Sequence, residues 1–268
     1  MRWLIVTALL ACVLLCSAAM GGARQFSVAK RVDNLDSSAE DRKQSSVATS
    51  RVDHGDNFLP KKAEESAQRA AVLRQTQTAT SLLSAIRLLG ESSRLFAAAR
   101  SYDKAAEAQL QIGEIYMILS EFNKARKSFD EAFKIAHDME LRCGALSDIA
   151  RLYASIGPYS LADDYSRQAL SMCENLSARP QAEALEARGE VLHSGGEYSK
   201  SADCLRRARD LFVIAKDDNG QAQALLMLAY ALFSQGSERL QGLQAAGEAL
   251  RLWSLGENRF GVAQVHAA

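Results

Sequence analysis

The sequence predicts an all-α fold in which helix-turn-helix hairpins stack into a solenoid. Four small residues recur at intervals of 37, 39 and 40 residues: Gly113, Ala150, Gly189 and Ala229. A set of alanines follows them nineteen residues later, or twenty in the last case: Ala132, Ala169, Ala208 and Ala249. A period in this range is typical of helical solenoids, because each repeat is one supersecondary unit that buries its apolar face only against its neighbours.

The stretch from 112 to 136, IGEIYMILSEFNKARKSFDEAFKIA, shows how one repeat would fold. Residues three and four apart lie on one helix face, so each half of the stretch presents an apolar stripe. The two stripes are Ile112, Gly113 and Tyr116 in the first half, and Ala125, Phe129 and Ala132 in the second. A glycine at the crossing lets the helix axes approach to roughly 8–10 Å. The stretch therefore predicts a closely packed hairpin.

Copies of this pattern predict four helix pairs after residue 100. We expect first helices at 102–119, 140–156, 179–194 and 218–235, and second helices at 122–138, 159–174, 198–215 and 239–253. Turn residues separate them: Gly157 ends one helix, and Pro158 opens the next, where its missing N–H costs nothing. Gly195, Gly196 and Gly236 occupy comparable places later in the chain.

Position by position, residues 101–268 resemble the tetratricopeptide repeat (TPR) family. The leading apolar position is leucine in three blocks: Leu146, Leu185 and Leu225. The pattern is broken at four places: Gln109, Ser166, Arg188 and Ala246. The resemblance implies a right-handed superhelical α-solenoid with four repeats and a truncated fifth. The longer blocks are similar to the long-repeat variety found before CHAT peptidase domains in larger bacterial proteins.

The N-terminal region predicts export. Residues 1–23 resemble a signal peptide, with a positive start, an apolar core of thirteen residues at 3–15 and small residues after it. We expect a mature N-terminus at Met20 or Arg24 in a periplasmic or secreted protein. A membrane anchor formed by the uncleaved signal and lipidation of an N-terminal cysteine are the alternatives, although the core is shorter than the ~20 residues that a span needs.

Two segments precede the repeats. Residues 24–60 are polar and lack periodicity, which predicts a flexible linker. Residues 61–100 are rich in helix-forming residues and predict a leading helical segment that covers the first repeat. We interpret this segment as one long helix in which Gly90 introduces a kink.

Composition and motifs favour neither catalysis nor nucleic-acid binding. The chain is 48% hydrophobic and 24% charged, and Lys+Arg and Asp+Glu are both 32, so no net charge favours nucleic acid. The motifs HExxH, GxSxG, GxxxxGK and CxxC do not occur, and the four histidines are scattered. We expect no catalytic residue, metal or small-molecule cofactor. Cys143, Cys173 and Cys204 lie on different predicted helices without paired spacing, and we interpret them as small buried residues.

The resemblance places the candidate peptide-binding surface on the concave side, which first helices line in similar proteins. The residues expected there follow the small core position directly or by three to four further residues: Glu114, Met117, Arg151, Ser155, Glu190, His193, Tyr230 and Phe233. An acidic first block, a single arginine and an apolar last block would suit a peptide or helix with charged and apolar anchors. The family's carboxylate-gripping Lys/Asn/Arg set is missing, so capture of a free acidic C-terminus is not expected.

These features together predict an exported, non-catalytic repeat scaffold that binds a protein or peptide. Two alternatives stay open: the N-terminal recognition part of a larger CHAT-type peptidase, and an assembly subunit of an envelope complex. Self-association through the C-terminal repeat is a further expectation, because the stretch after it is too short to cover its apolar residues. Those residues are Leu250, Leu252, Trp253 and Leu255.

Overall fold

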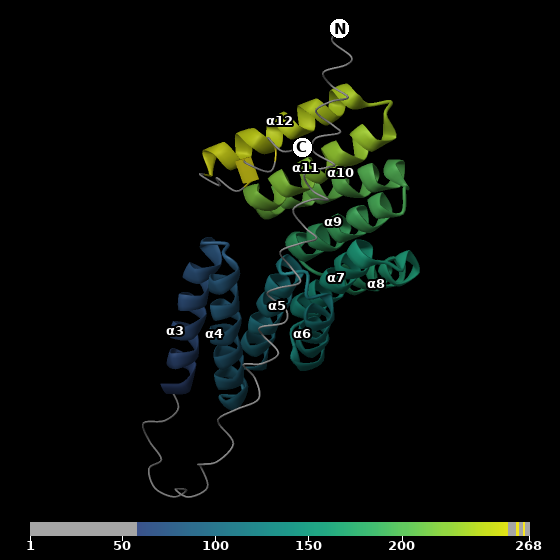
Figure 1. Ribbon diagram of the computed structural model, residues 1–268. Coiled ribbons are helices and arrows are strands. Elements are labelled where there is room, and N and C mark those ends of the chain that lie inside the picture. Colours follow the sequence, from purple (N-terminus) through teal and green to yellow (C-terminus); the bar gives the residue numbers. More distant parts are fainter. Residues whose placement is uncertain (1–57, 257–260, 263–264, 266–268) are drawn as a thin grey trace, which may run out of the picture. The chain divides into compact units, whose positions relative to one another are not determined.

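The computed structural model describes residues 58–256, 261–262 and 265, in which the secondary structure is helical (Figure 1). The helices in this part are α3 (Phe58–Gln75), α4 (Ala79–Ala98), α5 (Tyr102–Ile118), α6 (Phe122–Ile135), α7 (Met139–Ile156), α8 (Tyr159–Cys173), α9 (Ala178–Ser194), α10 (Tyr198–Ala215), α11 (Asp218–Gln235) and α12 (Arg239–Leu255). The expected signal segment at 1–23, and all but the last residues of the expected linker, lie outside the described residues.

The helices pack as a repeat solenoid. Each helix packs against the helices before and after it in the sequence, and the first helices α5, α7, α9 and α11 also touch one another in succession. The prediction of an all-α repeat solenoid is therefore confirmed. Seven of the eight predicted repeat helices agree with the structure to within two residues at each end, and α6 is the exception.

Helix α6 ends at Ile135, three residues early, because a carboxylate from the preceding first helix intervenes. The Asp103 Oδ1 atom accepts hydrogen bonds from the backbone N–H groups of Asp138 (2.9 Å) and His137 (2.7 Å), which lower the pKa of Asp103. The Asp138 carboxylate then caps α7 by accepting from the Glu140 N–H at 2.8 Å. A residue of α5 thus builds the turn between two repeats, and the repeat period alone gives no sign of this.

The leading segment is a hairpin, so the interpretation of it as one kinked helix is wrong. Helices α3 and α4 are separated by a turn at 76–78, where Gln77 has a φ of 50°. The Thr78 Oγ1 atom accepts from the Ser81 N–H at 3.2 Å, and the Ser81 hydroxyl accepts from the Thr78 N–H at 3.2 Å. This capping box begins a new helix by satisfying N–H groups that lack a helical partner. Gly90 lies within α4.

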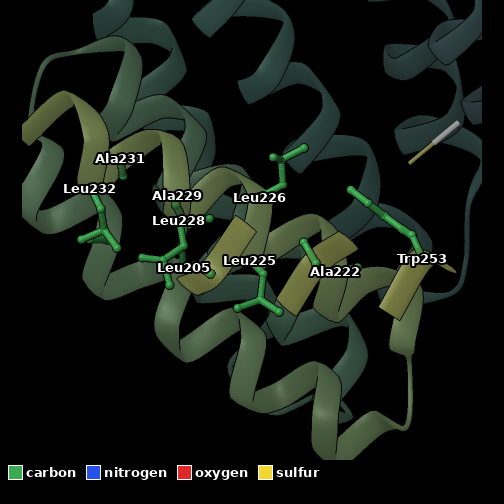
Figure 2. Close-up of a cluster of buried hydrophobic side chains, with 12 residues drawn as sticks. Leu205, Ala222, Leu225, Leu226, Leu228, Ala229, Ala231, Leu232 and Trp253 are labelled. Atoms are coloured by element: carbon green, nitrogen blue, oxygen red, sulfur yellow. The ribbon is translucent and has the colours of Figure 1, made fainter. Parts of the chain in front are cut away.

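Small residues at the helix crossings set the packing within each repeat. A methyl group added to Gly113 would overlap the Phe129 ring, and one added to Gly189 would lie 2.6 Å from the Leu205 side chain. Glycine therefore permits the close approach that the sequence pattern predicts. Figure 2 shows the apolar interior at the end of the array, where leucines of α10 and α11 lie with Trp253 of α12 in one buried cluster.

The C-terminal end of the array is partly covered. Trp253 is only 3% exposed, so the expectation that it meets water is wrong. Its indole N–H donates to Asn219 Oδ1 at 2.9 Å, and Val262 and Val265 pack against its cluster. The large apolar residues that are exposed on α12, at 70%, 62% and 72%, are Leu240, Leu243 and Leu255.

Departures from the repeat pattern contact one another. Arg188 of α9 stands where an apolar residue is expected, and its guanidinium donates to the Ser166 hydroxyl of α8 at 2.8 Å and pairs with Asp163. Gln109 of α5 likewise donates to the Ser93 hydroxyl of α4 at 3.1 Å. Because buried polar groups are tolerated when they are hydrogen-bonded, these substitutions are compatible with close helix packing.

Candidate binding face on the first helices

Polar contacts run from helix to helix along the side on which the first helices touch. Arg74 of α3 forms an ion pair with Glu114 of α5 at 2.7 Å, and Arg151 of α7 forms one with Glu190 of α9 at 3.0 Å. We name the surface that carries these contacts the first-helix face. Its residues are those of the first helices that make such contacts, Gln111, Glu114, Asp148, Arg151, Glu183, Glu186, Glu190, His193 and Ser234, together with the half-buried Met227 and Tyr230 of α11.

At the centre of this face, one arginine contacts three carboxylates. The Arg151 Nη1 atom donates to Asp148 Oδ1 of its own helix at 3.1 Å. The Nη2 atom donates to Glu186 Oε2 at 3.1 Å, and the Nε atom donates to Glu190 Oε1 at 3.0 Å. These four residues form the carboxylate cluster, which ties α7 to α9.

Burial changes the acid–base behaviour of the carboxylate cluster. Burial, partly offset by Arg151, raises the pKa of Glu186 well above its usual value and that of Asp148 to about 7. Burial disfavours the charge of Arg151, but Glu190, Glu186 and Asp148 outweigh this effect and hold its pKa above the ordinary value. The Glu186 Oε1 atom is buried without a hydrogen-bond partner. An acceptor left in this state costs about 1–3 kcal/mol, so the cluster is arranged at some expense of stability.

The structure brings two predicted site residues, Arg151 and Glu190, together and adds two that sequence reasoning missed. Asp148 precedes Arg151 by three positions and Glu186 precedes Glu190 by four, so each shares a helix face with its predicted neighbour. That spacing is the signal that could have found them. The predicted Ser155 lies outside the cluster, because its hydroxyl donates to the Arg151 carbonyl within α7 at 3.0 Å.

His193 and Tyr230 lie where the charged part of the face meets its apolar part. The His193 Nε2 atom is 3.1 Å from Ser234 Oγ of α11, and the imidazole ring centre is 5.2 Å from that of Tyr198. Burial lowers the pKa of His193, which favours the neutral imidazole at neutral pH. Tyr230 is half-buried and packs against the apolar cluster of α10, α11 and α12.

Two other predicted site residues, Met117 and Phe233, are half-buried in the helix packing. Met117 packs against the cluster that contains Phe129 of α6. The Phe233 ring lies against α12, where a methyl group added to Gly242 would be 2.9 Å from it. Their side chains therefore pack in the helix interior and are not free surface residues of the first-helix face.

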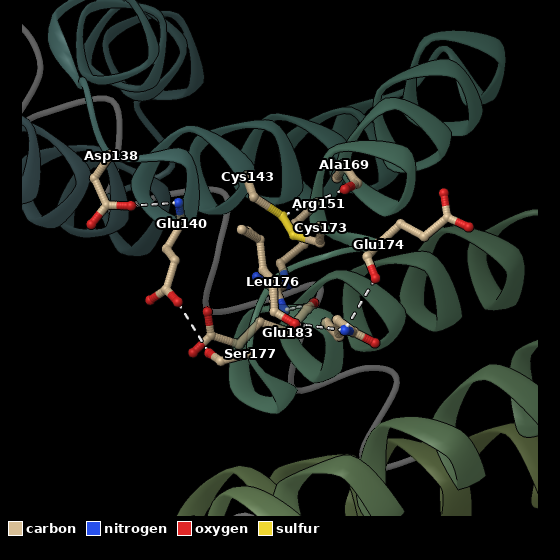
Figure 3. Close-up of a disulfide and its surroundings, with 11 residues drawn as sticks. Asp138, Glu140, Cys143, Arg151, Ala169, Cys173, Glu174, Leu176, Ser177 and Glu183 are labelled. Atoms are coloured by element: carbon tan, nitrogen blue, oxygen red, sulfur yellow. Dashed lines mark hydrogen bonds between the residues drawn. A yellow bond between two sulfur atoms is a disulfide. The ribbon is translucent and has the colours of Figure 1, made fainter.

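A disulfide joins the two helices of the second repeat. Cys143 of α7 and Cys173 of α8 are bonded (Figure 3), with Cα atoms 6.0 Å apart. Both side chains are buried, as expected, but the sequence predicts no bond between them. Sequence reasoning missed the pair because its members lie 30 residues apart on different helices, with no short spacing to mark them. Cys204 is free, and burial raises the pKa of its thiol.

An all-α array of stacked hairpins defines a class, the helical-repeat proteins. Within that class, residues 106–138, mostly in α5 and α6, match the tetratricopeptide repeat family. No curated protein sequence matches the chain.

Solved structures show the same fold at low sequence identity. Aspartyl phosphate phosphatase F from Bacillus subtilis is 15% identical with a TM-score of 0.60, over 80% of this chain and 56% of that one. A Rap protein complexed with competence and sporulation factor is 15% identical with a TM-score of 0.65, over 76% and 57%. TPR-like repeats of a putative kinesin light chain from Podosopora anserina are 13% identical with a TM-score of 0.50, over 73% and 98%. The chain thus spans little more than half the length of the first two proteins.

None of the helices between residues 58 and 256 is both long and apolar enough to cross a membrane. Over the same residues, no three His, Cys, Asp or Glu side chains are grouped so that they could hold a metal ion.

Proposed function

We propose that this protein is a non-catalytic scaffold that binds a protein or peptide on its first-helix face. The observation that carries the proposal is Arg151, which bridges α7 and α9 and holds three carboxylates in place. Because Arg151 already holds these side chains in position in the free protein, they lose less conformational entropy when a partner binds. The half-buried Tyr230 nearby is of a residue type that often dominates binding energy. The Rap protein, solved with competence and sporulation factor, supports a binding role for this fold.

Site-specific crosslinking in the native cell tests the proposal. A photo-reactive amino acid at position 190 should give discrete crosslinked products, because Glu190 lies on the first-helix face. The matched control is position 164, since Asp164 is exposed on the second helix α8. Equal crosslinking at the two positions, or none at position 190, would contradict binding on this face.

We further propose that the protein is exported. The Cys143–Cys173 disulfide supports this, because such bonds persist in oxidising compartments and are rare in the cytosol. N-terminal sequencing of secreted or periplasmic material should begin at Met20 or Arg24. An uncleaved or lipidated N-terminus in the membrane fraction would favour anchoring instead, and an intact Met1 in soluble cytosol would contradict export.

We also propose that a second copy can associate with the C-terminal repeat, because α12 carries the exposed Leu240, Leu243 and Leu255. The two remaining alternatives, a part of a larger CHAT-type peptidase and an envelope assembly subunit, have no specific feature of the described residues in their favour. Coding sequence downstream of Ala268 would reveal the first, and a stable co-complex the second.

A further inference from the structure

The carboxylates of the first-helix face differ in how their charge is compensated. Glu114 pairs with Arg74 at 2.7 Å, and Glu183 pairs with Arg179 at 3.0 Å. The three carboxylates of the carboxylate cluster instead share the single guanidinium of Arg151. The cluster thus has two carboxyl groups more than it has guanidinium groups, and a cation brought beside Glu186 and Asp148 would favour the ionised forms that burial disfavours. This excess sits at the junction of α7 and α9, where two first helices meet.

A second observation points to a missing donor at the same place. Glu186 is 6% exposed, and its Oε2 atom accepts from Arg151, so its carboxylate lies within the cluster. Its Oε1 atom is buried and accepts no hydrogen bond. Native proteins leave few buried acceptors unpaired, and such a group calls for a specific explanation. An N–H donor of a partner would supply this bond once the side chains that cover Oε1 move aside.

We infer that the carboxylate cluster receives a lysine or arginine side chain of the bound segment, and that a bulky apolar side chain about three positions away lies over α11. The inference rests on the proposed function and names the chemistry of the partner. An ammonium or guanidinium group offers several N–H donors and forms charge-assisted hydrogen bonds with carboxylates. An acidic segment would instead meet three carboxylates around one arginine, and like charges brought together disfavour the wrong partner.

The spacing follows from the helix arrangement. Helices α9 and α11 are neighbours on the face, since His193 contacts Ser234. Packed helices lie roughly 8–10 Å apart. An extended chain advances about 3.3 Å per residue, so it crosses from one helix to the next in about three residues. On α11, Met227 and Tyr230 are both half-buried and lie three residues apart on one helix face, which provides the apolar contact.

Peptide selection on the full chain tests this motif. Random dodecapeptides displayed on phage are selected against the immobilised protein, and the best sequence is synthesised with acetylated and amidated ends. We expect enrichment of lysine or arginine, with a bulky apolar residue about three positions away. Replacing the basic residue with glutamine should weaken binding about tenfold or more, and moving the apolar residue by two positions should weaken it similarly. Selected peptides without a basic preference would overturn the inference.

Variants of the protein connect the motif to the cluster. Glu186→Gln and Glu190→Gln should each weaken binding of the basic peptide several-fold, but leave binding of its glutamine form almost unchanged. Glu190 is the safer test, because its side chain is 25% exposed and its loss leaves no buried gap. Asp164→Asn on α8 makes the same charge change away from the face and should change neither affinity.

The outcomes separate this inference from the proposed function. If Glu190→Gln weakens binding of the basic peptide and of its glutamine form equally, with helicity preserved, the cluster does not recognise the basic residue. The proposed peptide binding would still hold in that case. Selection that yields no binding peptide from the wild-type protein would contradict peptide binding on this face, and the inference would fail with it.

Discussion

Arg188 shows how a single departure from the repeat pattern is accommodated at the residue scale. It stands at an apolar position of α9, yet its side chain is only 14% exposed and meets Asp163 and Ser166 of α8. Ser166 also departs from the pattern, so two residues that do not fit the repeat in the sequence contact each other in the structure. The sequence identified both positions, but the contact joins residues 22 positions apart and could not be paired without the helix packing.

Removing Arg188 should therefore destabilise the array. Arg188→Leu would leave the partly buried Asp163 carboxylate without this partner, and we expect the free energy of unfolding to fall by about 2–4 kcal/mol. Arg167 supplies the matched control, because it pairs with the same carboxylate but is 64% exposed. Arg167→Leu should change stability by less than about 1 kcal/mol. Urea denaturation measures both, and equal losses would contradict a special role for the buried pair.

Asp148 makes stability depend on pH in a specific direction. Burial raises its pKa in the folded protein to about 7, whereas in an unfolded chain it would be about 4. The folded state therefore binds an extra proton between these values, and the stabilisation present at low pH is lost as pH rises toward and through 7. Relative to wild type, Asp148→Asn should become progressively more stable between pH 5 and pH 8.

Denaturation at several pH values checks this expectation. The stability difference between Asp148→Asn and wild type should grow with pH, while that for Asp164→Asn should stay constant, because Asp164 is exposed. A pH-independent difference for Asp148→Asn would mean that its carboxyl ionises in the folded protein as it does in the unfolded chain.

At the scale of the helix, the sequence predicts helix boundaries where a glycine, a proline or the repeat period indicates them. It does not predict boundaries at which side-chain hydrogen bonds form the turn. The leading segment shows this, since the capping box of Thr78 and Ser81 splits a continuous run of helix formers into α3 and α4. The early end of α6 shows it again, because Asp103 acts from another helix. Both turns depend on side-chain hydrogen bonds that propensity and periodicity do not report.

The disulfide between α7 and α8 provides a prediction at the same scale. Closing a loop of 30 residues should stabilise the folded state by about 3–4 kcal/mol through the lost entropy of the unfolded chain. The double variant Cys143→Ser/Cys173→Ser should lose roughly this amount in urea denaturation, whereas Cys204→Ser should lose little. When residues 24–268 are purified in oxidised form and then unfolded, a thiol reagent should label only Cys204. Labelling of all three cysteines would contradict the disulfide.

For the whole molecule, the repeat pattern was sufficient to predict the fold but only part of the candidate site. The period and the small residues recur in every block, so each block specifies the same helix packing. The carboxylate cluster occurs once among residues 58–256, and of its members only Arg151 and Glu190 are predicted from the sequence. The other two members, Asp148 and Glu186, are acidic residues in a chain where a quarter of residues are charged, and only their helical spacing from Arg151 and Glu190 marks them.

Helix α12 leads to a prediction for the whole molecule. Leu240 and Leu243 are 70% and 62% exposed on one helix face, and an apolar patch of this kind favours association. Light scattering on purified residues 24–268 should show an increase in mass at micromolar concentration, and Leu240→Gln/Leu243→Gln should abolish it.

The control for association is Leu161→Gln, which changes an exposed leucine of α8 and should leave the mass unchanged. A monomer at every concentration that also fails to bind a hydrophobic dye would show that α12 needs no second copy.

The bridge between α7 and α8 also determines how the protein would respond to mechanical force. In a solenoid each hairpin contacts only its neighbours, so a pull on the two ends should peel hairpins away one at a time. The 30 residues between Cys143 and Cys173 cannot extend while the bond is intact, which withholds about 100 Å of contour length. A chain stretched in an oxidising environment would therefore stop short of full extension, and a reductant applied under tension would release that length in a single step.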